Sequence, residues 1–144
     1  MAVPLAILLA SRQVLKTKTV RDIEEGFAWS EQERSDALFV GATAFLNSRR
    51  VQLVQLAAFH HLPATYGQRE AVEAGGLMSY GPSILEGYRQ LAIYAGRVLK
   101  GAKPGDLPVV QSTKFELVIN NTTARMFGLT VPPSLLAIAD EVIE

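Results

Sequence analysis

Two short apolar segments end on the same pair of residues, a tyrosine followed by a glycine, at Tyr66-Gly67 and Tyr80-Gly81. A strand that stops on such a pair brings an aromatic ring and accessible backbone to the edge of a sheet. Ligands of open α/β sheets bind outside the carboxyl ends of the strands. The polar segment between the two pairs, residues 68–74, predicts a helical turn. We therefore expect a binding cleft where these two strands end.

Hydrophobic periodicity predicts the elements that position this cleft. Strands are predicted at residues 13–18, 36–41, 63–67, 77–80 and 114–120. Helices are predicted from Thr19 to about residue 30 and at residues 42–60, 68–74, 83–100, 122–127 and 132–144. Because strands and helices alternate, we expect a three-layer α/β domain, with a mainly parallel sheet of about five strands between layers of helices.

Several residues mark the ends and buried faces of these elements. Thr19 and Asp22 have the spacing of a capping box, and Gly101 stands where a left-handed helix cap is expected. Asn121 is predicted to cap the short helix that follows it. The segment at residues 36–41 is continuously apolar, as is typical of a strand that is buried on both faces.

Two predicted helices have a stripe of side chains at helical spacing. In the helix that begins at Thr19, the buried stripe is predicted to contain Ile23, Phe27 and Ser30. In the helix at residues 83–100, the stripe is apolar and consists of Ile84, Leu85, Tyr88, Leu91, Ala92, Ala95, Val98 and Leu99.

The composition is that of a folded domain with balanced charge. The 144 residues fit one domain, and the apolar content of 49% suits a well-buried core. The 14 basic and 14 acidic residues cancel, so no excess of positive charge favours nucleic acid. Residues 1–10 are apolar but lack the positive start of an export signal and the ~20-residue length of a membrane span. We interpret them as a buried or edge element.

No set of residues predicts catalysis. His60 and His61 are the only histidines and there is no cysteine, whereas a zinc site needs three or four convergent ligands. There is no G-x-S-x-G nucleophile elbow and no glycine-rich phosphate or dinucleotide motif. We therefore expect no enzymatic activity, no metal and no cofactor.

Five blocks of sequence resemble one family in order and spacing. They are SDALFVGATAFLNSRR, HLPATYGQREAVEAGGLMSYGP, RVLKGAKPGDLPV, TKFELVIN and GLTVPPSLLAIADEVIE. Together they resemble the carboxyl-terminal part of bacterial ABC-transporter substrate-binding proteins with the type I periplasmic-binding-protein fold. Within that family they resemble the branch associated with tryptophan or tyrosine uptake. The resemblance covers roughly residues 13–144, and residues 1–12 fit it poorly.

The resemblance implies one part of a two-lobed protein. Members of the family have two α/β lobes joined by a multi-strand hinge, with the ligand clamped between them. The chain resembles the second lobe without its first strand, so we expect residues 1–144 to form a single, truncated domain. Its relatives work outside the inner membrane with a membrane permease. This chain has no recognisable export signal or lipid-attachment cysteine, so we expect it to stay in the cytoplasm as it stands.

The resemblance also implies where a ligand is contacted. The implied positions follow the ends of three strands: Gly41, Ala42, Thr43, Phe45, Tyr66, Gln68, Arg69, Glu70, Ser79, Tyr80 and Gly81. The amides after the first strand would face a ligand carboxylate, as at other helix amino termini. Arg69 would pair with a carboxylate and Glu70 with an amine, whereas Gly75 and Gly76 would serve a turn.

Each of these positions also has a purely structural interpretation. Tyr66 and Tyr80 fit packing in the core or hinge as well as ligand contact. Phe45 fits the core, and residues 69–70 fit the solvated start of a helix. The two arginines at residues 49–50 are interpreted as a solvated face, because two arginines do not make a basic patch.

The expected function is the solute-binding part of an ABC-type importer, which binds a small amino-acid-like or aromatic solute between two lobes. The alternative is a ligand-sensing domain of a transcriptional or signalling regulator on the same scaffold. A small flavodoxin-like enzyme is a third hypothesis, but the sequence offers it no convergent catalytic set. Because the helix at residues 83–100 would face the missing lobe, we expect its apolar stripe to be exposed and to form a homodimer.

Overall fold

The computed structural model describes residues 13–110 and 114–144 of the chain. Its elements are α1 (Val20–Gln32), β1 (Leu38–Val40), α2 (Ala44–Ser48), α3 (Arg50–Phe59), β2 (Ala64–Tyr66), α4 (Arg69–Glu73), β3 (Met78–Pro82), α5 (Ile84–Leu99), the 3₁₀ turn η1 (Pro104–Asp106), β4 (Phe115–Asn120), α6 (Asn121–Met126), α7 (Pro133–Leu136) and β5 (Glu141–Ile143). No helix in the described ranges is long and apolar enough to cross a membrane.

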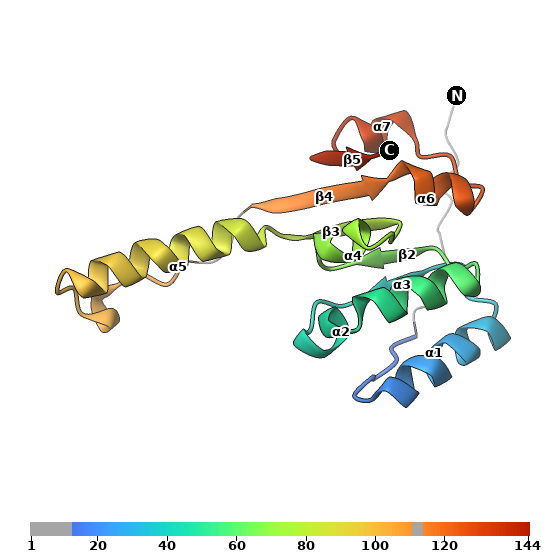
Figure 1. Ribbon diagram of the computed structural model, residues 1–144, viewed down its shortest axis with the longest axis horizontal. Coiled ribbons are helices and arrows are strands. Elements are labelled where there is room, and N and C mark those ends of the chain that lie inside the picture. The colour runs from blue at the N-terminus through green and yellow to red at the C-terminus, as the bar shows by residue number, and fades with distance from the viewer. Residues whose placement is uncertain (1–12, 111–113) are drawn as a thin grey trace, which may run out of the picture.

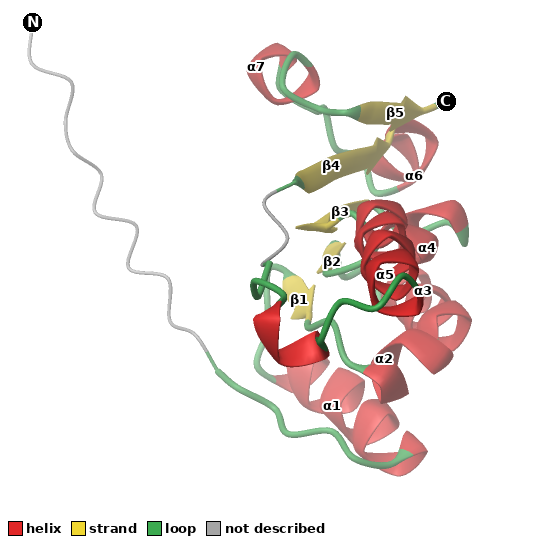
Figure 2. Ribbon diagram, turned by 90° about the vertical axis from the view of Figure 1, so that its left-hand side faces the viewer, coloured by secondary structure: helices red, strands yellow, loops and turns green. Residues whose placement is uncertain are grey.

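The five strands form one sheet in the order β1-β2-β3-β4-β5. All neighbouring strands are parallel except β3 and β4, which are antiparallel. Val40 lies opposite Tyr66, and Tyr66 lies opposite Ser79. Figure 2 shows α3, α4 and α6 on one side of the sheet and α7 on the other. The predicted three-layer α/β fold with a mostly parallel five-stranded sheet is therefore confirmed.

The main hydrophobic core joins α1, α3 and α4 to β1 and β2. Its buried members are Ile23, Phe27, Val40, Leu53, Val54, Ala57, Leu62, Ala64, Tyr66 and Ala71. The predicted stripe of α1 is confirmed, since all three of its residues are buried. Val118 and Ile119 of β4 are also fully buried, so the antiparallel half of the sheet is firmly packed.

Helix α5 leaves the rest of the molecule as an arm. It extends beyond the β3 end of the sheet (Figure 1), and none of its residues is buried. The expected exposure of its apolar stripe is confirmed at Leu85, Tyr88, Leu91, Val98 and Leu99. The chain turns back after the arm through a left-handed residue at position 101, with φ of 98°, as the glycine there predicts.

The capping box at the start of α1 is confirmed. The Asp22 amide donates to Thr19 Oγ1 at 3.2 Å, and Asp22 Oδ2 accepts from the Thr19 amide at 2.8 Å. The backbone amides of Lys18 and Thr19 hold the pKa of Asp22 below its ordinary value. The cap of α6 differs from the prediction. Asn120, and not Asn121, accepts the Thr123 amide at 2.9 Å.

Two segments predicted from periodicity differ in the structure. Residues 13–18 are not a strand, because no described strand pairs with them, and Leu15 lies near Gly26 of α1 instead. The helix predicted at residues 42–60 is two helices that meet at Arg49, where φ is −104° and ψ is 12°. Just before this break, the Ser48 hydroxyl donates to the Phe45 carbonyl at 2.7 Å, a local bond that competes with the helical pattern.

The end of the chain and the first strand also differ from expectation. The helix predicted at residues 132–144 stops after one turn, and β5 follows it. Asp140 exchanges hydrogen bonds with Leu117 of β4, 2.9 and 2.8 Å long, which pulls the chain onto the sheet. β1 is an edge strand and is not buried on both faces, because Phe39 is 68% exposed. The interpretation of residues 1–10 lies outside the described residues.

Candidate functional site

The three strand ends of the predicted cleft meet backbone to backbone. The Gly67 amide donates to the Val40 carbonyl at 3.0 Å. A Cβ atom at Gly67 would lie 2.8 Å from the Cβ of Ala42, and a Cβ atom at Gly81 would overlap the Gly67 carbonyl. The glycines of both Tyr-Gly pairs are thus required by close approach, and the expected meeting of the strand ends is confirmed.

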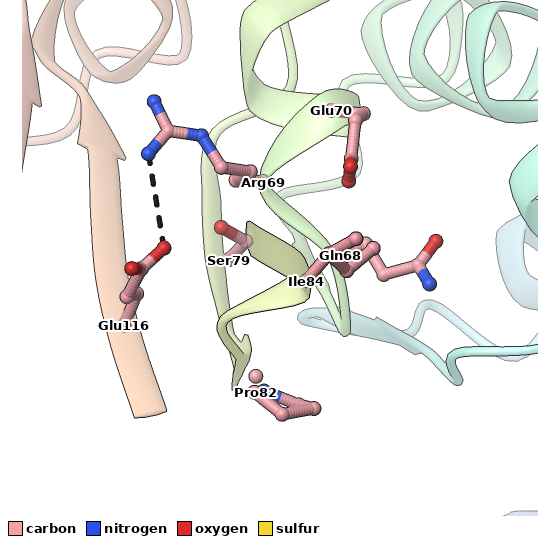
Figure 3. A pocket seen from close by; sticks show the side chains of 8 residues that line it. Gln68, Arg69, Glu70, Ser79, Pro82, Ile84 and Glu116 are labelled. Carbon is pink, nitrogen blue, oxygen red and sulfur yellow. Dashed lines mark ion pairs between the residues drawn. The ribbon is translucent and has the colours of Figure 1, made fainter. Parts of the chain in front are cut away.

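One hollow lies over the ends of β2 and β3, and we call it the acidic hollow. It is lined by Gln68, Arg69, Glu70, Ser79, Gly81, Pro82, Ile84 and Glu116 (Figure 3). Its volume is about 220 Å³, including space open to solvent. It therefore brings together predicted site residues that follow two different strands.

Arg69 is engaged by carboxylates of the protein itself. Its Nε lies 2.9 Å from Glu73, its Nη2 lies 2.8 Å from Glu141, and its Nη1 lies 3.7 Å from Glu116. The hydrogen bonds to Glu73 and Glu141 raise the pKa of Arg69 above its ordinary value. Figure 3 shows the guanidinium turned toward Glu116 and away from the carboxylate of Glu70. Arg69 thus ties α4 to β4 and β5.

Glu70 is the one acidic side chain of the hollow that the protein leaves incompletely paired. Within the described residues, its Oε2 atom is buried and has no hydrogen-bond partner. A buried carboxylate oxygen without a donor costs free energy. Its surroundings already hold Glu116 and the other carboxylates around Arg69, so a positively charged donor would be favoured there.

A second hollow adjoins the first and shares Gln68 with it, and we call it the arginine hollow. It is lined by Val40, Gly41, Ala42, Leu46, Asn47, Arg50, Leu53, Tyr66, Gly67, Gln68 and Ala71. Its volume is about 240 Å³, again including space open to solvent. Arg50 is its single charged lining residue. The interpretation of residues 49–50 as a solvated face fits exposed Arg49, whereas half-buried Arg50 borders this hollow.

The structure places other predicted site residues away from both hollows. Tyr80 is 56% exposed and stacks on Phe115 at 5.6 Å, whereas its neighbours Ser79 and Gly81 line the acidic hollow. Phe45 packs against the core, which supports its structural interpretation. Thr43 caps α2, because its Oγ1 accepts from the Leu46 amide at 3.2 Å.

Tyr66 belongs to the core and also borders the arginine hollow. It is only 3% exposed, and burial raises the pKa of its phenol far above the ordinary tyrosine value. A Cβ atom at Gly76 would lie 2.7 Å from the Tyr66 ring, and Gly75 has φ of 101°. The turn role predicted for these two glycines agrees with this geometry.

His60 is accounted for by packing, whereas His61 is exposed. His60 Nδ1 lies 3.0 Å from Glu31 Oε2, and the His60 ring stacks on Phe27 with centroids 5.6 Å apart. Over residues 13–110 and 114–144, no group of three or more histidine, aspartate and glutamate side chains could hold a metal ion.

Sequence reasoning missed Glu116, Asn47 and Arg50 as lining residues. Glu116 had a signal, because it is an acidic residue within the otherwise apolar strand FELVI. Arg50 had a weaker one, because it stands beside a second arginine within the helix predicted at residues 42–60. Its position became clear only with the break at Arg49, which turns α3 so that Arg50 faces the strand ends.

A family model described as "ABC transporter substrate binding protein" matches residues 9–143. The chain belongs to this family. A comparison with curated proteins found no match. The membership confirms the family resemblance inferred from the five sequence blocks.

Solved structures place this substrate-binding protein among longer relatives. A conserved domain protein from Vibrio cholerae is 27% identical with a TM-score of 0.76, over 85% of this chain and 41% of that one. An ABC domain from Streptococcus pneumonia in complex with L-Trp is 29% identical with a TM-score of 0.73, over 84% of this chain and 43% of that one.

The fold is shared more widely. The substrate-binding protein CD0873 from Clostridium difficile, solved in a ligand-free, open form, has a TM-score of 0.60 at 19% identity, over 88% of this chain and 42% of that one. The chain thus matches less than half the length of each of the three structures.

Proposed function

We propose that this chain contributes one wall of the solute site in an ABC-type importer, and that the solute is a small amino-acid-like or aromatic molecule. Family membership supports a solute-binding role. The relative from Streptococcus pneumonia, which was solved with L-Trp, supports an amino acid as the solute. The adjoining hollows at the carboxyl ends of the strands support the location, since ligands of α/β sheets bind there.

The observation on which the proposal chiefly rests is the buried, unpaired Oε2 atom of Glu70. An ammonium group would supply the missing donor and would balance the surplus of carboxylates around Arg69. Charge-assisted hydrogen bonds of this kind are about twice as strong as neutral ones. We therefore assign the solute's amine to Glu70, with Gln68, Ser79 and Gly81 as neighbouring contacts.

The exposure of the site to solvent argues for a clamp. Each hollow includes space that is open to solvent, so neither hollow encloses a solute by itself. The solute would be enclosed only when a second lobe closes over it, and its contacts with both lobes would stabilise the closed form. A membrane permease would then recognise that form, on the extracytoplasmic side. The proposed role is binding without catalysis.

Calorimetric titration tests the proposal directly. The 144-residue chain and a two-lobed version, completed with the first lobe of a relative, are titrated with tryptophan, tyrosine, phenylalanine and branched amino acids. We expect the two-lobed protein to bind at least one of them and the 144-residue chain to bind more weakly. If neither protein binds any of these solutes, the proposed solute class is wrong.

Substitution of Glu70 tests the assignment of the amine. Glu70→Gln keeps the size of the side chain and removes its charge, so affinity for amino acids should fall at least about tenfold. Glu24→Gln, on the exposed side of α1, is the matched control and should bind as the wild type does. Equal affinity in all three proteins would refute the role of Glu70.

A further inference from the structure

We infer that Arg50, and not Arg69, binds the anionic group of the solute, which makes the solute a carboxylic acid. This inference rests on the proposed solute-binding function and names the chemistry of its second anchor. The sequence directed attention to Arg69, because it follows a strand at the expected cleft. The ion pairs of Arg69, and the lack of an ion pair at Arg50 among the described residues, point the other way.

Arg69 has no free charge to offer. Its three guanidinium nitrogens each face a carboxylate of the chain, at 2.9 Å from Glu73, 2.8 Å from Glu141 and 3.7 Å from Glu116. A solute carboxylate placed there would have to displace one of these partners and would meet the negative charge of the others. Like charges at such a site repel, so Arg69 is a positioning residue that holds α4 against the sheet.

Arg50, unlike Arg69, is not paired with a carboxylate of the described chain. Within the described residues it has no carboxylate within ion-pair distance. Its only hydrogen bond there runs from Nη1 to the Asn47 carbonyl at 3.2 Å. Its side chain borders the arginine hollow, which has no acidic lining residue. The bond to Asn47 anchors one nitrogen, and the rest of the guanidinium fork remains available for a planar carboxylate.

The two hollows together complement a zwitterion. Gln68 lines both of them, with the unpaired Glu70 on one side and Arg50 on the other. A solute that places an ammonium group in the acidic hollow and a carboxylate in the arginine hollow would meet opposite charge at each end. The amide side chains of Asn47 and Gln68 add neutral donors at the carboxylate end. This arrangement favours an amino acid over an amine or an acid alone.

The test uses the 144-residue chain and solution NMR, which detects millimolar binding. The probes are L-tryptophan, L-tryptophanamide, indole-3-propionate and indole-3-propionamide, so that each carboxylate has an amide counterpart. The signals followed are the Nε–Hε resonances of Arg50 and Arg69 and the backbone amides. Wild-type protein should bind the two carboxylates, should shift the Arg50 signal most, and should bind each amide at least about tenfold more weakly.

The variants separate charge from structure. Arg50→Gln should weaken binding of both carboxylates at least about tenfold and leave the amide probes unchanged. Arg50→Lys should recover part of the loss, because it restores the charge without the fork. Arg49→Gln is the matched control, since the exposed neighbouring arginine lines neither hollow, and it should bind as the wild type does.

Each outcome decides between the two proposals. If tryptophan binds equally to wild-type protein and Arg50→Gln, the role of Arg50 is refuted and the solute-binding function stands. If indole-3-propionate binds at Arg50 but no amino acid binds, the role of Arg50 stands and the amino-acid function is refuted. If no probe binds the wild-type chain, the role of Arg50 in this chain is refuted, and titration of the two-lobed protein decides the solute-binding function.

Discussion

At the scale of single residues, the site depends on two glycines, whose lack of a side chain allows backbones to approach closely. Gly67 and Gly81 let three strand ends touch, and this contact forms the floor that both hollows share. The sequence displayed the two glycines as a repeated Tyr-Gly pair. Sequence alone could not show that neighbouring residues occupy the space where a side chain at either glycine would lie, because that depends on the register of β1, β2 and β3.

Gly81→Ala should destabilise the domain. The new methyl group would overlap the Gly67 carbonyl, so the strands must separate, at a cost of about 1–3 kcal/mol in the free energy of unfolding. Gly87→Ala is the control, because a Cβ atom there meets nothing within 4 Å and alanine is the better helix former. Urea denaturation measures both variants. Equal stability of Gly81→Ala and the wild type would contradict the tight strand contact.

Tyr66 should make the fold sensitive to alkali. Burial raises the pKa of its phenol in the folded state, so above the ordinary tyrosine pKa of about 10 the unfolded state loses a proton that the folded state keeps. The stability that Tyr66 contributes is therefore fully present below about pH 10 and is lost as the pH rises further.

Denaturation curves between pH 8 and 11.5 test this effect of Tyr66. Tyr66→Phe should lose less stability over that range than the wild type. Tyr88→Phe is the control, since Tyr88 is exposed on α5, and its curve should follow the wild type. If the stability of Tyr66→Phe falls with pH as steeply as that of the wild type, other groups cause the loss of stability at alkaline pH.

At the scale of elements, α5 differs from the other long helices of the described chain, because none of its residues is buried. The Tyr94 hydroxyl donates to the Pro108 carbonyl, which ties the arm only to the loop that follows it. Isolated helices of this length are marginally stable in water. Its helical form therefore depends on whatever covers its apolar stripe.

Hydrogen exchange should distinguish this arm from the sheet. At high dilution, amides of Ile84–Leu99 should exchange within seconds, whereas amides of Leu117 to Asn120, which are buried in β4, should remain protected. Mass spectrometry of the two peptides measures the contrast. Equal protection in dilute solution would mean that α5 is covered within a single chain.

Elements were predictable from sequence where local pattern and long-range pairing agree. The apolar run of β1 and the Tyr-Gly end of β2 have both, whereas α5 was predictable from its amphipathic pattern alone. The errors lie where a distant partner decides. Asp140 is drawn onto β4 by Leu117, 23 residues away in sequence, and residues 13–18 alternate as a strand does but pair with no strand of the described chain.

At the scale of the whole molecule, two exposed apolar surfaces of the described chain bear on how it associates. One is the stripe of α5, and the other is the outer face of β3 and β4, where Tyr80 and Phe115 stack. Contiguous apolar patches of this kind mark interaction sites. The matched structures are about twice as long as this chain, so their remaining parts could cover these surfaces, and so could a second copy of the chain.

We propose that the isolated chain forms a homodimer through α5. The substitution pair Tyr88→Lys and Leu91→Lys places charge in the middle of the stripe, so it should shift the chain toward the monomer and leave the stability of the sheet unchanged. Light scattering over a wide concentration range measures the state of both proteins. The matched control is Lys100→Glu, which changes a charge just beyond the helix. A wild-type chain that stays monomeric throughout would refute the dimer.

The length of α5 would amplify small movements at the strand ends into larger displacements of the helix tip. Only Ser83 separates β3, whose residues line the acidic hollow, from the 16-residue helix α5. At 1.5 Å per residue the helix is about 24 Å long, so a tilt of about 5° at its base displaces its tip by about 2 Å. A spin label or fluorophore near Leu99 would therefore magnify small rearrangements at the strand ends into a readable signal, far from any atom that touches solute.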